Sequence, residues 1–287
     1  MRVLTIGGTG KVGKPLLSRL SAKGVDLRVI TRSPNRASEL STGAEAFLID
    51  IVDDPDTALE AFKGVDAVFM LNAASVQETV EGLLVVALAR QAGIGRFVYQ
   101  SVHCLEAMAQ LPHIAPKLVI ERAIQTSGMD YTLLRPNHFY QNDDDCRFAL
   151  MNSDVYIQPI GPVGCWRVDV RDIAEAAAIV LTTDGHSGET YAIVGPENLT
   201  GEDCAEAWGK ALGRQICYIG DIDVWKEGVR PFIPAWLNFD LGLMHYAFAE
   251  RGMQATMVDL ERLSKLLGRG PRNFQSYADE KAEEWKS

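Results

Sequence analysis

A glycine-rich segment near the start of the chain is the strongest chemical signal in the sequence. Gly7-Gly8-Thr9-Gly10-Lys11-Val12-Gly13 follows directly on a short run rich in β-branched residues, Arg2–Ile6. Glycine permits the positive backbone angles of a tight turn, and its missing side chain lets the backbone approach a pyrophosphate. A helix that begins at such a loop points its amides and its positive dipole end at the phosphates. We therefore predict a dinucleotide-binding turn, with cofactor contacts from Gly7, Thr9, Gly10, Lys11, Val12 and Gly13.

A nucleoside-triphosphate loop is the competing interpretation of the same residues. Gly8 to Lys14 fits the pattern Gly-x-x-x-x-Gly-Lys, in which the next residue is a Ser or Thr that holds magnesium. That place is occupied by Pro15, which has no hydroxyl. The dinucleotide interpretation is therefore favoured, and a plain glycine turn without a ligand is the remaining alternative.

Basic residues stand where the choice between NADH and NADPH is usually made. Arg32 and Ser33 follow the second predicted strand, Leu27–Thr31, and Arg36 lies nearby. An acidic residue at this place would bind the ribose 2′-hydroxyl of NAD, whereas arginine suits a 2′-phosphate through fork-like, charge-assisted bonds. We therefore predict NADP(H) over NAD(H), although a solvated surface role for Arg32 is the alternative.

Strand-like and helix-like segments alternate along the chain and would position these residues. This order predicts a parallel sheet covered by helices on both sides, followed by a second, smaller lobe from about Leu199. Strands are predicted at Arg2–Ile6, Leu27–Thr31, Ala46–Ile49, Ala67–Leu71, Arg96–Ser101, Tyr131–Leu134 and Thr190–Val194. Helices are predicted at Leu16–Ala22, Ala37–Leu40, Thr57–Phe62, Val76–Gln91, Leu118–Thr126, Val170–Leu181, Glu202–Leu212 and Thr256–Leu267, with capping candidates from Asp53 to Asp56.

Composition and charge exclude several classes of protein. The 287 residues are 47% hydrophobic and 23% charged, which is typical of a globular chain and not of a disordered one. The net charge of −10 disfavours nucleic acid and anionic membrane as partners. No apolar run reaches the length of a bilayer span, and no signal peptide is expected because strand-like residues begin at Arg2. Five widely spaced cysteines, none in a Cys-x-x-Cys pair, indicate a reduced, cytoplasmic protein.

The chain resembles the atypical short-chain dehydrogenases/reductases and, among them, the NmrA-like family. The resemblance rests on the glycine segment, on Arg32, on His113-x-x-x-Lys117-x-x-x-Glu121, and on further stretches at 48–50, 65–69, 96–101, 127–136, 168–174 and 188–191. It implies a Rossmann-type doubly wound parallel sheet with a smaller C-terminal α/β lobe, and NADP(H) in the cleft between them. We expect residues 1–137 plus about 166–197 to form the NAD(P)-binding domain, and about 138–165 plus 198–287 the substrate-binding lobe.

The same resemblance implies further contact residues, at places where ligands lie beyond the carboxyl ends of parallel strands. Asp50 and Ile51 should lie near the adenine. Additional cofactor contacts are expected from Leu71, Asn72, Ala73, Ser101, Lys117, Pro136, Asn137, His138 and Phe139. Substrate contacts are expected from His138, Phe139, Tyr140 and Trp236.

The catalytic position departs from the usual pattern. Standard short-chain reductases use a serine with Tyr-x-x-x-Lys; here Ser101 and Lys117 are in place, but His113 stands where the tyrosine would be. A positioned general acid is worth about a hundred- to ten-thousand-fold, so its loss is costly for ketone reduction. Quinones and cationic dyes accept hydride with less help from an acid. Lys117, His113 and Ser101 are the catalytic candidates, and a structural hydrogen bond is the alternative for His113.

Other groups of residues give weaker signals. Asp143-Asp144-Asp145 could bind a metal, but no nearby histidine supports this, and we expect a solvated turn that caps a helix at Cys146 and no metal. His103 and Cys104 follow Ser101 and are candidates to face the site. A run of aromatic residues is expected to form the core of the second lobe, with a lid over the substrate as the alternative: Trp225, Phe232, Trp236, Phe239, Tyr246 and Phe248.

Two functions from different classes remain open. The first is an NADPH-dependent reductase that transfers hydride to a quinone-like or other conjugated small molecule, acting as a monomer or homodimer. The second is a redox-sensing regulator that binds NADP(H) without turnover and acts through a protein partner, which the missing tyrosine favours. Epimerase or isomerase chemistry on this fold would lack its tyrosine, and DNA-binding repression is disfavoured by the acidic charge.

Overall fold

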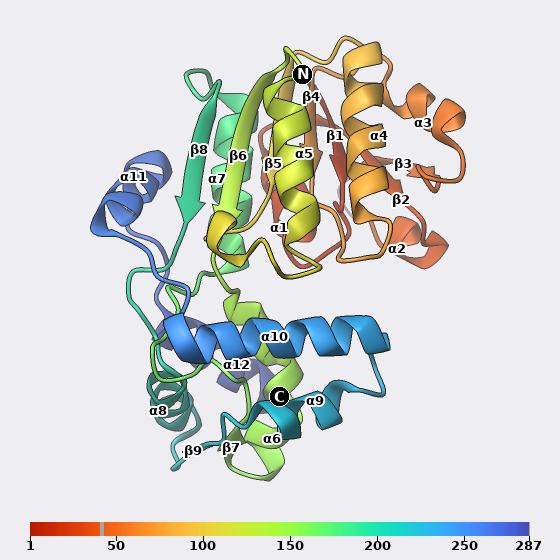
Figure 1. The fold of residues 1–287 in the computed structure, drawn as a ribbon. Coiled ribbons are helices and arrows are strands. Elements are labelled where there is room, and N and C mark those ends of the chain that lie inside the picture. The colour runs from red at the N-terminus through yellow and green to blue at the C-terminus, as the bar shows by residue number, and fades with distance from the viewer. Residues whose placement is uncertain (41–42, 287) are drawn as a thin grey trace. The chain divides into compact units, whose positions relative to one another are not determined.

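The computed structural model describes residues 1–40 and 43–286, which divide into two units (Figure 1). The first unit comprises Met1–Ala109, His113–Arg135 and Val170–Tyr191, and the second comprises Gln110–Pro112, Pro136–Asp169 and Ala192–Ser287. Residues 41–42 and 287 fall inside the predicted domain ranges but lie outside the described residues. Assignment of the cofactor to one range and the substrate to the other stays a prediction.

A seven-stranded sheet, carried mainly by the first unit, has the strand order β3-β2-β1-β4-β5-β6-β8. Val3 in β1 pairs in parallel with Leu27 on one side and with Ala67 on the other. The strand order therefore reverses beside β1, and such a reversal opens a crevice at the carboxyl ends of the strands. The strands are β1 Arg2–Ile6, β2 Asp26–Thr31, β3 Glu45–Leu48, β4 Ala67–Met70, β5 Arg96–Gln100, β6 Asp130–Pro136 and β8 Glu189–Ile193.

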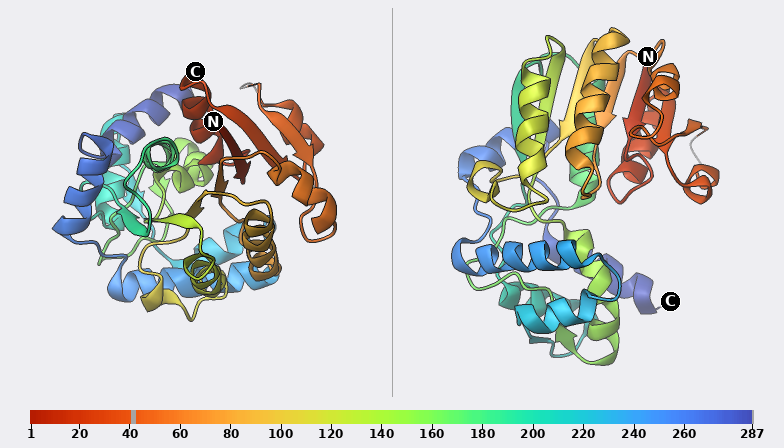
Figure 2. Two further views of the ribbon diagram at one scale, coloured as in Figure 1. Left: turned by 90° about the horizontal axis from the view of Figure 1, so that it is seen from above. Right: turned by 45° about the vertical axis from the view of Figure 1, so that its right-hand side comes forward.

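Helices cover both faces of this sheet, which confirms the predicted Rossmann-type α/β fold (Figure 2). One face carries α3, α4 and α5, which pack in that order, and the other carries α1 packed against α7. The short α2 packs beside β2 and β3. The bounds are α1 Gly13–Ala22, α2 Pro34–Ser38, α3 Pro55–Phe62, α4 Glu78–Gln91, α5 Ala115–Gln125 and α7 Val170–Thr182, with a 3₁₀ turn at Glu106–Met108.

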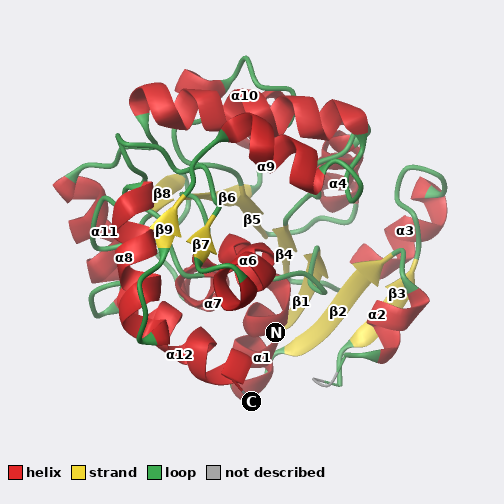
Figure 3. Ribbon diagram, turned by 90° about the horizontal axis from the view of Figure 1, so that it is seen from below, coloured by secondary structure: helices red, strands yellow, loops and turns green. Residues whose placement is uncertain are grey.

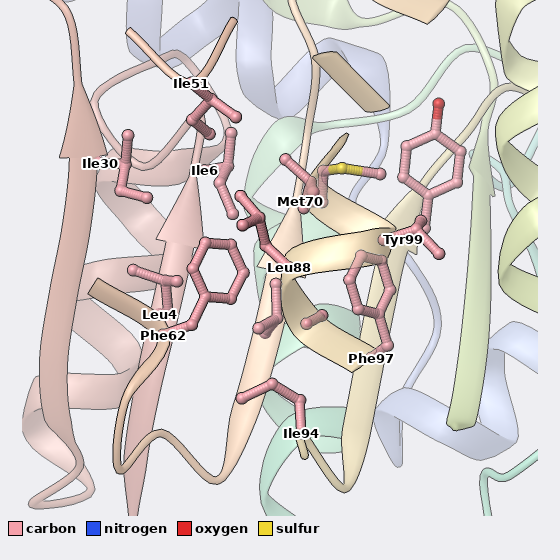
Figure 4. Close-up of a cluster of buried hydrophobic side chains, with 14 of the residues drawn as sticks. Leu4, Ile6, Ile30, Ile51, Phe62, Met70, Leu88, Ile94, Phe97 and Tyr99 are labelled. Atoms are coloured by element: carbon pink, nitrogen blue, oxygen red, sulfur yellow. The ribbon is translucent and has the colours of Figure 1, made fainter. Parts of the chain in front are cut away.

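The core between the sheet and helices α3 to α5 explains why these segments fold as they do (Figure 4). Leu4 and Ile6 from β1 pack with Phe62 from α3 and Leu88 from α4, and all four are buried. Every residue of β4 is buried, as its uninterrupted apolar sequence predicts for a central strand. Burial at about 25 cal/mol per Å² of apolar surface is the main favourable term that fixes the sheet beneath the site.

Most predicted elements agree with the structure to within a few residues. The helix predicted at Ala37–Leu40 begins earlier, at Pro34, because the Ser33 side chain accepts a hydrogen bond from the amide of Arg36. Asp54 caps α3 by accepting from the amide of Thr57, and the hydrogen bonds with Thr57 lower the pKa of this carboxyl. The region 137–166, where the sequence predicts no strand and no helix other than one at Cys146, contains a 3₁₀ segment, a helix and a strand.

The second unit is mainly helical around a two-stranded parallel sheet (Figure 3). In this sheet β7, Val155–Tyr156, pairs with β9, Cys217–Tyr218. Its helices are α6 Arg147–Asn152, α8 Gly201–Leu212, α9 Ile222–Val229, α10 Ala235–Arg251, α11 Met257–Leu267 and α12 Phe274–Lys286, preceded by the 3₁₀ segment Tyr140–Cys146. No helix in the described part of the chain is both long and apolar enough to cross a membrane.

The acidic run at 143–145 is only in part the solvated turn that the sequence predicts, because Asp145 is exposed and Asp144 half-buried but Asp143 is not solvated. Asp143 is fully buried and pairs with the buried Arg167, at 2.6 Å between Oδ1 and Nη2. Tyr156 and Trp208 also donate hydrogen bonds to its carboxylate, at 3.1 and 3.0 Å. Helix α6 begins next to this run without a side-chain cap. The prediction was wrong because partners far along the chain bury this carboxylate. Across the described ranges, no three His, Cys, Asp or Glu residues group to hold a metal.

The aromatic run at 225–248 corrects a second prediction. Phe248 is buried, and Trp225 and Trp236 are half-buried, but Phe232 and Phe239 are 83% and 61% exposed. Tyr246 is also about half exposed. The core of the second unit forms instead around Tyr140, Trp208, Phe274, Tyr277 and Trp285. In that core the rings of Trp208 and Trp285 stack 4.9 Å apart.

Asp143→Asn should destabilise the second unit strongly, because the neutral amide leaves the buried Arg167 cation without compensation. We expect a loss of about 3–5 kcal/mol in the free energy of unfolding. Urea denaturation followed by tryptophan fluorescence measures this, since all five tryptophans lie in the second unit. Asp154→Asn is the matched control, because Asp154 pairs with Arg214 at the surface, where the expected cost is about 0–1 kcal/mol. Equal losses in the two variants would contradict this account of Asp143.

Candidate functional site

A pocket of about 270 Å³ lies in the first unit at the carboxyl ends of its strands. Ile6 ends β1, Thr31 ends β2, and Leu71 follows β4. The pocket therefore occupies the crevice that the reversal of strand order creates beside β1. Eight of the residues predicted to bind cofactor line it: Gly7, Thr9, Arg32, Ser33, Arg36, Ile51, Leu71 and Ala73.

The glycine loop is shaped by close backbone contacts that exclude side chains. Gly7 has φ of +82°, and a Cβ there would lie 2.4 Å from the carbonyl oxygen of Leu71. A Cβ on Gly13 would lie 2.4 Å from the carbonyl oxygens of Gly7 and Gly8. These contacts fold the loop over the start of α1 and against the end of β4. No acidic residue lies in the first turn of α1, so the positive end of the helix dipole is not neutralised there.

Lys14 does not behave as the lysine of a triphosphate loop. Its ammonium bonds to the carboxylate of Glu39 at 3.2 Å, and both side chains are more than half exposed. The side chain thus points to Glu39 at the C-terminal end of α2. Pro15 offers no metal ligand. The geometry agrees with the dinucleotide interpretation of the loop.

One of the arginines that line the pocket pairs with a carboxylate that is not itself among the lining residues. The guanidinium of Arg32 lies 3.5 Å from the Asp50 carboxylate, whose other oxygen accepts from the amide of Val52 at 3.0 Å. Ser33 and Arg36 form the start of α2, where the Ser33 side chain accepts from the Arg36 amide at 3.4 Å. Two cationic side chains and a hydroxyl therefore gather at one end of the pocket, with one opposing charge. That composition suits a phosphate group.

Buried oxygens without partners test whether this region fits a polar ligand. Within the described residues, five buried side-chain oxygens of the first unit make no hydrogen bond: Asn72 Oδ1, Glu78 Oε2, Tyr99 OH, Gln100 Oε1 and Ser101 Oγ. Such atoms are uncommon in native proteins and are costly without a partner. Asn72 and Ser101 directly follow β4 and β5, at the strand ends where ligands bind. Together with the glycine loop, they fit a dinucleotide.

Lys117 is held by a carboxylate that the sequence did not single out. Its ammonium pairs with Glu78 on α4 and also donates to the carbonyl oxygen of His113 at 3.3 Å. Glu78 is fully buried, and burial raises its pKa although the positive charge of Lys117 opposes this. His113 and Lys117, four residues apart, are thus connected through the Lys117 ammonium and the backbone carbonyl of His113. Ser101 lies at the end of β5 in the same unit and is also buried.

The neighbouring His103 and Cys104 lie side by side. The Cys104 sulfur is 3.4 Å from Nδ1 of His103, and Cys104 has φ of +55°. The pair belongs to the first unit, just beyond Ser101. Whether these two residues face a substrate stays a prediction.

Gly10, Lys11 and Val12 lie in the glycine loop of the first unit, and six predicted residues belong to the second unit: Pro136, Asn137, His138, Phe139, Tyr140 and Trp236. The Asn137 amide donates to the carbonyl of Met253 at 2.8 Å, and its oxygen accepts from the His138 amide. Nε2 of His138 lies 3.1 Å from the amide nitrogen of Asn142. Tyr140 is buried in the core, where its hydroxyl donates to the Arg272 carbonyl at 3.2 Å. Burial raises the pKa of Tyr140, so this hydroxyl keeps its proton.

Sequence reasoning missed several residues of the site. Ile30, Thr31 and Ile49 line the pocket and lie directly beside predicted contacts, so strand-end position could have identified them. Glu81 also lines the pocket, and its carboxylate accepts from the Asn72 amide at 2.7 Å. Neither Glu81 nor Glu78 has a sequence signal, because a glutamate at the start of a helix is ordinarily solvated.

The chain belongs to the NmrA-like family, whose model matches residues 1–278. The family predicted from the sequence is therefore confirmed. Two named relatives match over nearly the whole chain. The NAD(P)H azoreductase of Xenophilus azovorans is 26% identical over 280 residues, 96% of each chain. The (4-alkanoyl-5-oxo-2,5-dihydrofuran-3-yl)methyl phosphate reductase of Streptomyces griseus subsp. griseus is 29% identical over 287 residues, 98% of each chain.

Solved structures show the same fold. The NADPH-dependent quinone oxidoreductase of Escherichia coli, complexed with NADPH, superposes with a TM-score of 0.85 at 24% identity, covering 98% of this chain and 99% of that one. NmrA, described as a negative transcriptional regulator and solved with NADP, gives a TM-score of 0.81 at 18% identity, covering 100% and 99%. Structural neighbours with this fold thus include both a reductase and a regulator.

Asp50→Asn should tighten the binding of NADP⁺. The amide oxygen can still accept from Val52, but the charge that offsets Arg32 is removed. Because Arg32 is about half exposed, the gain is at most about fivefold, the value of about 1 kcal/mol for an exposed pair. Calorimetric titration of wild type and variant with NADP⁺ measures it, and NAD⁺, which lacks the 2′-phosphate, serves as the matched ligand. Weaker binding of NADP⁺ by the variant would show that Asp50 assists the phosphate site.

Proposed function

We propose that the protein is an NADPH-dependent reductase that transfers hydride to a quinone-like or other conjugated small molecule. The observation that carries the proposal is the pocket at the strand ends, which joins the glycine loop to Arg32, Ser33 and Arg36. The proposal is supported by two whole-length relatives that are named as reductases. We further propose that the protein works in the cytoplasm, as a monomer or homodimer.

The residues divide between holding the cofactor and assisting the acceptor. Gly7 to Gly13 and the start of α1 would hold the pyrophosphate, and Arg32 with Arg36 would hold the 2′-phosphate. When bound, the reduced nicotinamide supplies the hydride. Lys117 would bind the ribose and provide positive potential, and Ser101 would offer its hydroxyl at the end of β5. An imidazole can hold or release a proton near neutral pH, and His113 is the candidate for that step.

The missing tyrosine decides which acceptors suit this site. A ketone needs a proton on the developing alkoxide, and a general acid there is worth about a hundred- to ten-thousand-fold. A conjugated acceptor spreads the incoming charge and needs less of this help. His113 in place of tyrosine therefore favours quinones and dyes over simple ketones.

A regulator without turnover is the second candidate. The departure at His113 favours it, and so does the fold that the chain shares with NmrA. In that case the same pocket would bind NADP(H), and a protein partner would respond to the bound state. The two functions differ in turnover and not in cofactor binding.

Arg32→Asp should remove any preference for NADPH. The variant loses a charge-assisted bond to the 2′-phosphate and gains a repelling charge. We expect NADP⁺ binding to weaken by about tenfold or more, while NAD⁺ binding is unchanged or improved. The ratio of the two dissociation constants, measured by calorimetry, tests this. An unchanged ratio would show that Arg32 is a solvated surface residue.

Mixing the purified protein with NADPH and a panel of quinones and cationic dyes tests turnover. Loss of the reduced-nicotinamide absorbance should be saturable and should fall by about a hundredfold in Lys117→Met, which removes a positive charge from the site. Lys63→Met is the matched control, because Lys63 pairs with Glu60 at the surface and should leave the rate unchanged. Tight NADPH binding without turnover across the panel would favour the regulator.

A further inference from the structure

A buried carboxylate and a nearly buried ammonium face each other across two helices of the first unit. Glu78 lies in the first turn of α4, and Lys117 lies in the first turn of α5. The Glu78 side chain is fully buried and the Lys117 side chain is 12% exposed. Figure 2 shows α4 and α5 alongside each other on one face of the sheet. The pair therefore connects the two helices at the ends nearer to the pocket-forming loops.

A small residue allows this approach. Gly82 lies one helical turn after Glu78, and Ile120 lies about one turn after Lys117. A Cβ on Gly82 would be 2.4 Å from Cδ1 and 2.6 Å from Cγ1 of the buried Ile120. A side chain at position 82 would thus push the helices apart beside the ion pair. The sequence of α4 keeps Glu78 within reach of Lys117.

Stability alone gives a weak reason for such a pair. Burying two charges costs several kcal/mol, and replacing a buried ion pair by apolar residues is often neutral or stabilising. In the buried pair of Asp143 with Arg167, both carboxylate oxygens accept hydrogen bonds. Glu78 differs, because its second oxygen has no partner among the described residues. An incompletely satisfied carboxylate about one helical turn before Glu81, which lines the pocket, points to a role in binding.

The donors of Lys117 show what the pair leaves available. An ammonium has three N–H donors. One is directed at Glu78 and one at the carbonyl of His113. The third N–H has no acceptor among the described residues, and the Lys117 side chain is 12% exposed. A lysine fixed at two of its three donors presents the third in one direction.

We propose that Glu78 is a positioning residue that holds the ammonium of Lys117 aimed at the ribose of the bound dinucleotide. This inference rests on the proposed function, since it assigns the free donor of Lys117 to the cofactor. Glu78 itself touches neither cofactor nor substrate. It acts through Lys117 by holding one N–H in a charge-assisted hydrogen bond.

The charged groups around Glu78 set the conditions for a test. Burial raises its pKa, the charges of Lys117 and His113 lower it, and the charge of Glu81 raises it. Tyr99 on β5 also has a raised pKa. Burial is the largest cause, and the negative charge of Glu78 is the next. Protonation of Glu78 would leave Lys117 without its counter-charge, and a raised carboxyl pKa brings this step closer to neutral pH. Measurements at about pH 8, well above the usual range of glutamate, therefore favour the ionised pair.

Calorimetric titration with NADP⁺ at that pH is the test. Glu78→Gln should weaken binding by about tenfold, because the amide cannot hold the ammonium by a charge-assisted bond. In a Lys117→Met background the same change should cost nothing further. Glu121→Gln is the matched control: Glu121 is a buried carboxylate on α5, one helical turn after Lys117, and it pairs with Arg135 at 2.6 Å. It should lose comparable stability in urea but bind NADP⁺ as wild type does.

Glu78→Asp keeps the charge with a shorter reach and provides the test if Glu78→Gln does not fold. We expect its affinity for NADP⁺ to lie between those of wild type and Glu78→Gln. Wild-type affinity in a folded Glu78→Gln or, failing that variant, in Glu78→Asp would overturn the inference. The inference would also be overturned if Glu78→Gln weakened NADP⁺ binding equally in the Lys117→Met background and in the protein that retains Lys117. Failure of the wild-type protein to bind NADP⁺ would instead overturn the proposed function.

Discussion

The loop after β1 must pass against the end of β4 with no side chain between them. A Cβ on Gly7 would lie 2.4 Å from the carbonyl oxygen of Leu71, and Gly7 has a positive φ that other residues adopt only with strain. This contact holds the loop in the crevice beside β1, where the strand order reverses. The start of α1, the pocket and the arginines at the end of β2 all follow from that placement. A side chain at Gly7 would move the loop and with it this part of the pocket lining.

Two buried ion pairs show how the same chemistry serves different ends. Asp143 and Arg167 in the second unit are enclosed by Tyr156 and Trp208, which donate to the carboxylate and leave it satisfied. That pair ties the start of the second unit to α8 and specifies its core. Glu78 and Lys117 in the first unit lack such closure, because one carboxylate oxygen has no protein donor in the described chain. The two carboxylates therefore differ in how completely they are hydrogen-bonded. The fully bonded one organises a core, and we assign the incompletely bonded one to a ligand site.

The sequence alone predicted the parts of the molecule that depend on local chemistry. Turn glycines, the cap at Asp54 and the apolar run of β4 act within a few residues, and each was correctly interpreted. Asp143 and Glu78 could not be interpreted in this way, because a carboxylate in a polar or helical segment is ordinarily solvated. Their burial comes from partners 24 and 39 residues away along the chain. The burial predicted for Phe232 and Phe239 was wrong for a similar reason. An aromatic run does not reveal which of its side chains pack inward, and these two are exposed.

The central claim is that the glycine loop of the first unit binds a dinucleotide and that Arg32 and Arg36 bind the 2′-phosphate of this dinucleotide. Calorimetric titration of the wild-type protein with NADP⁺, and with adenosine 2′,5′-bisphosphate and adenosine 5′-monophosphate as fragments, tests it most directly. We predict one NADP⁺ per chain, competition by the bisphosphate, and monophosphate binding weaker by about tenfold or more, the value of one charge-assisted bond. Absence of NADP⁺ binding, or a bisphosphate that binds no better than the monophosphate, would contradict the claim.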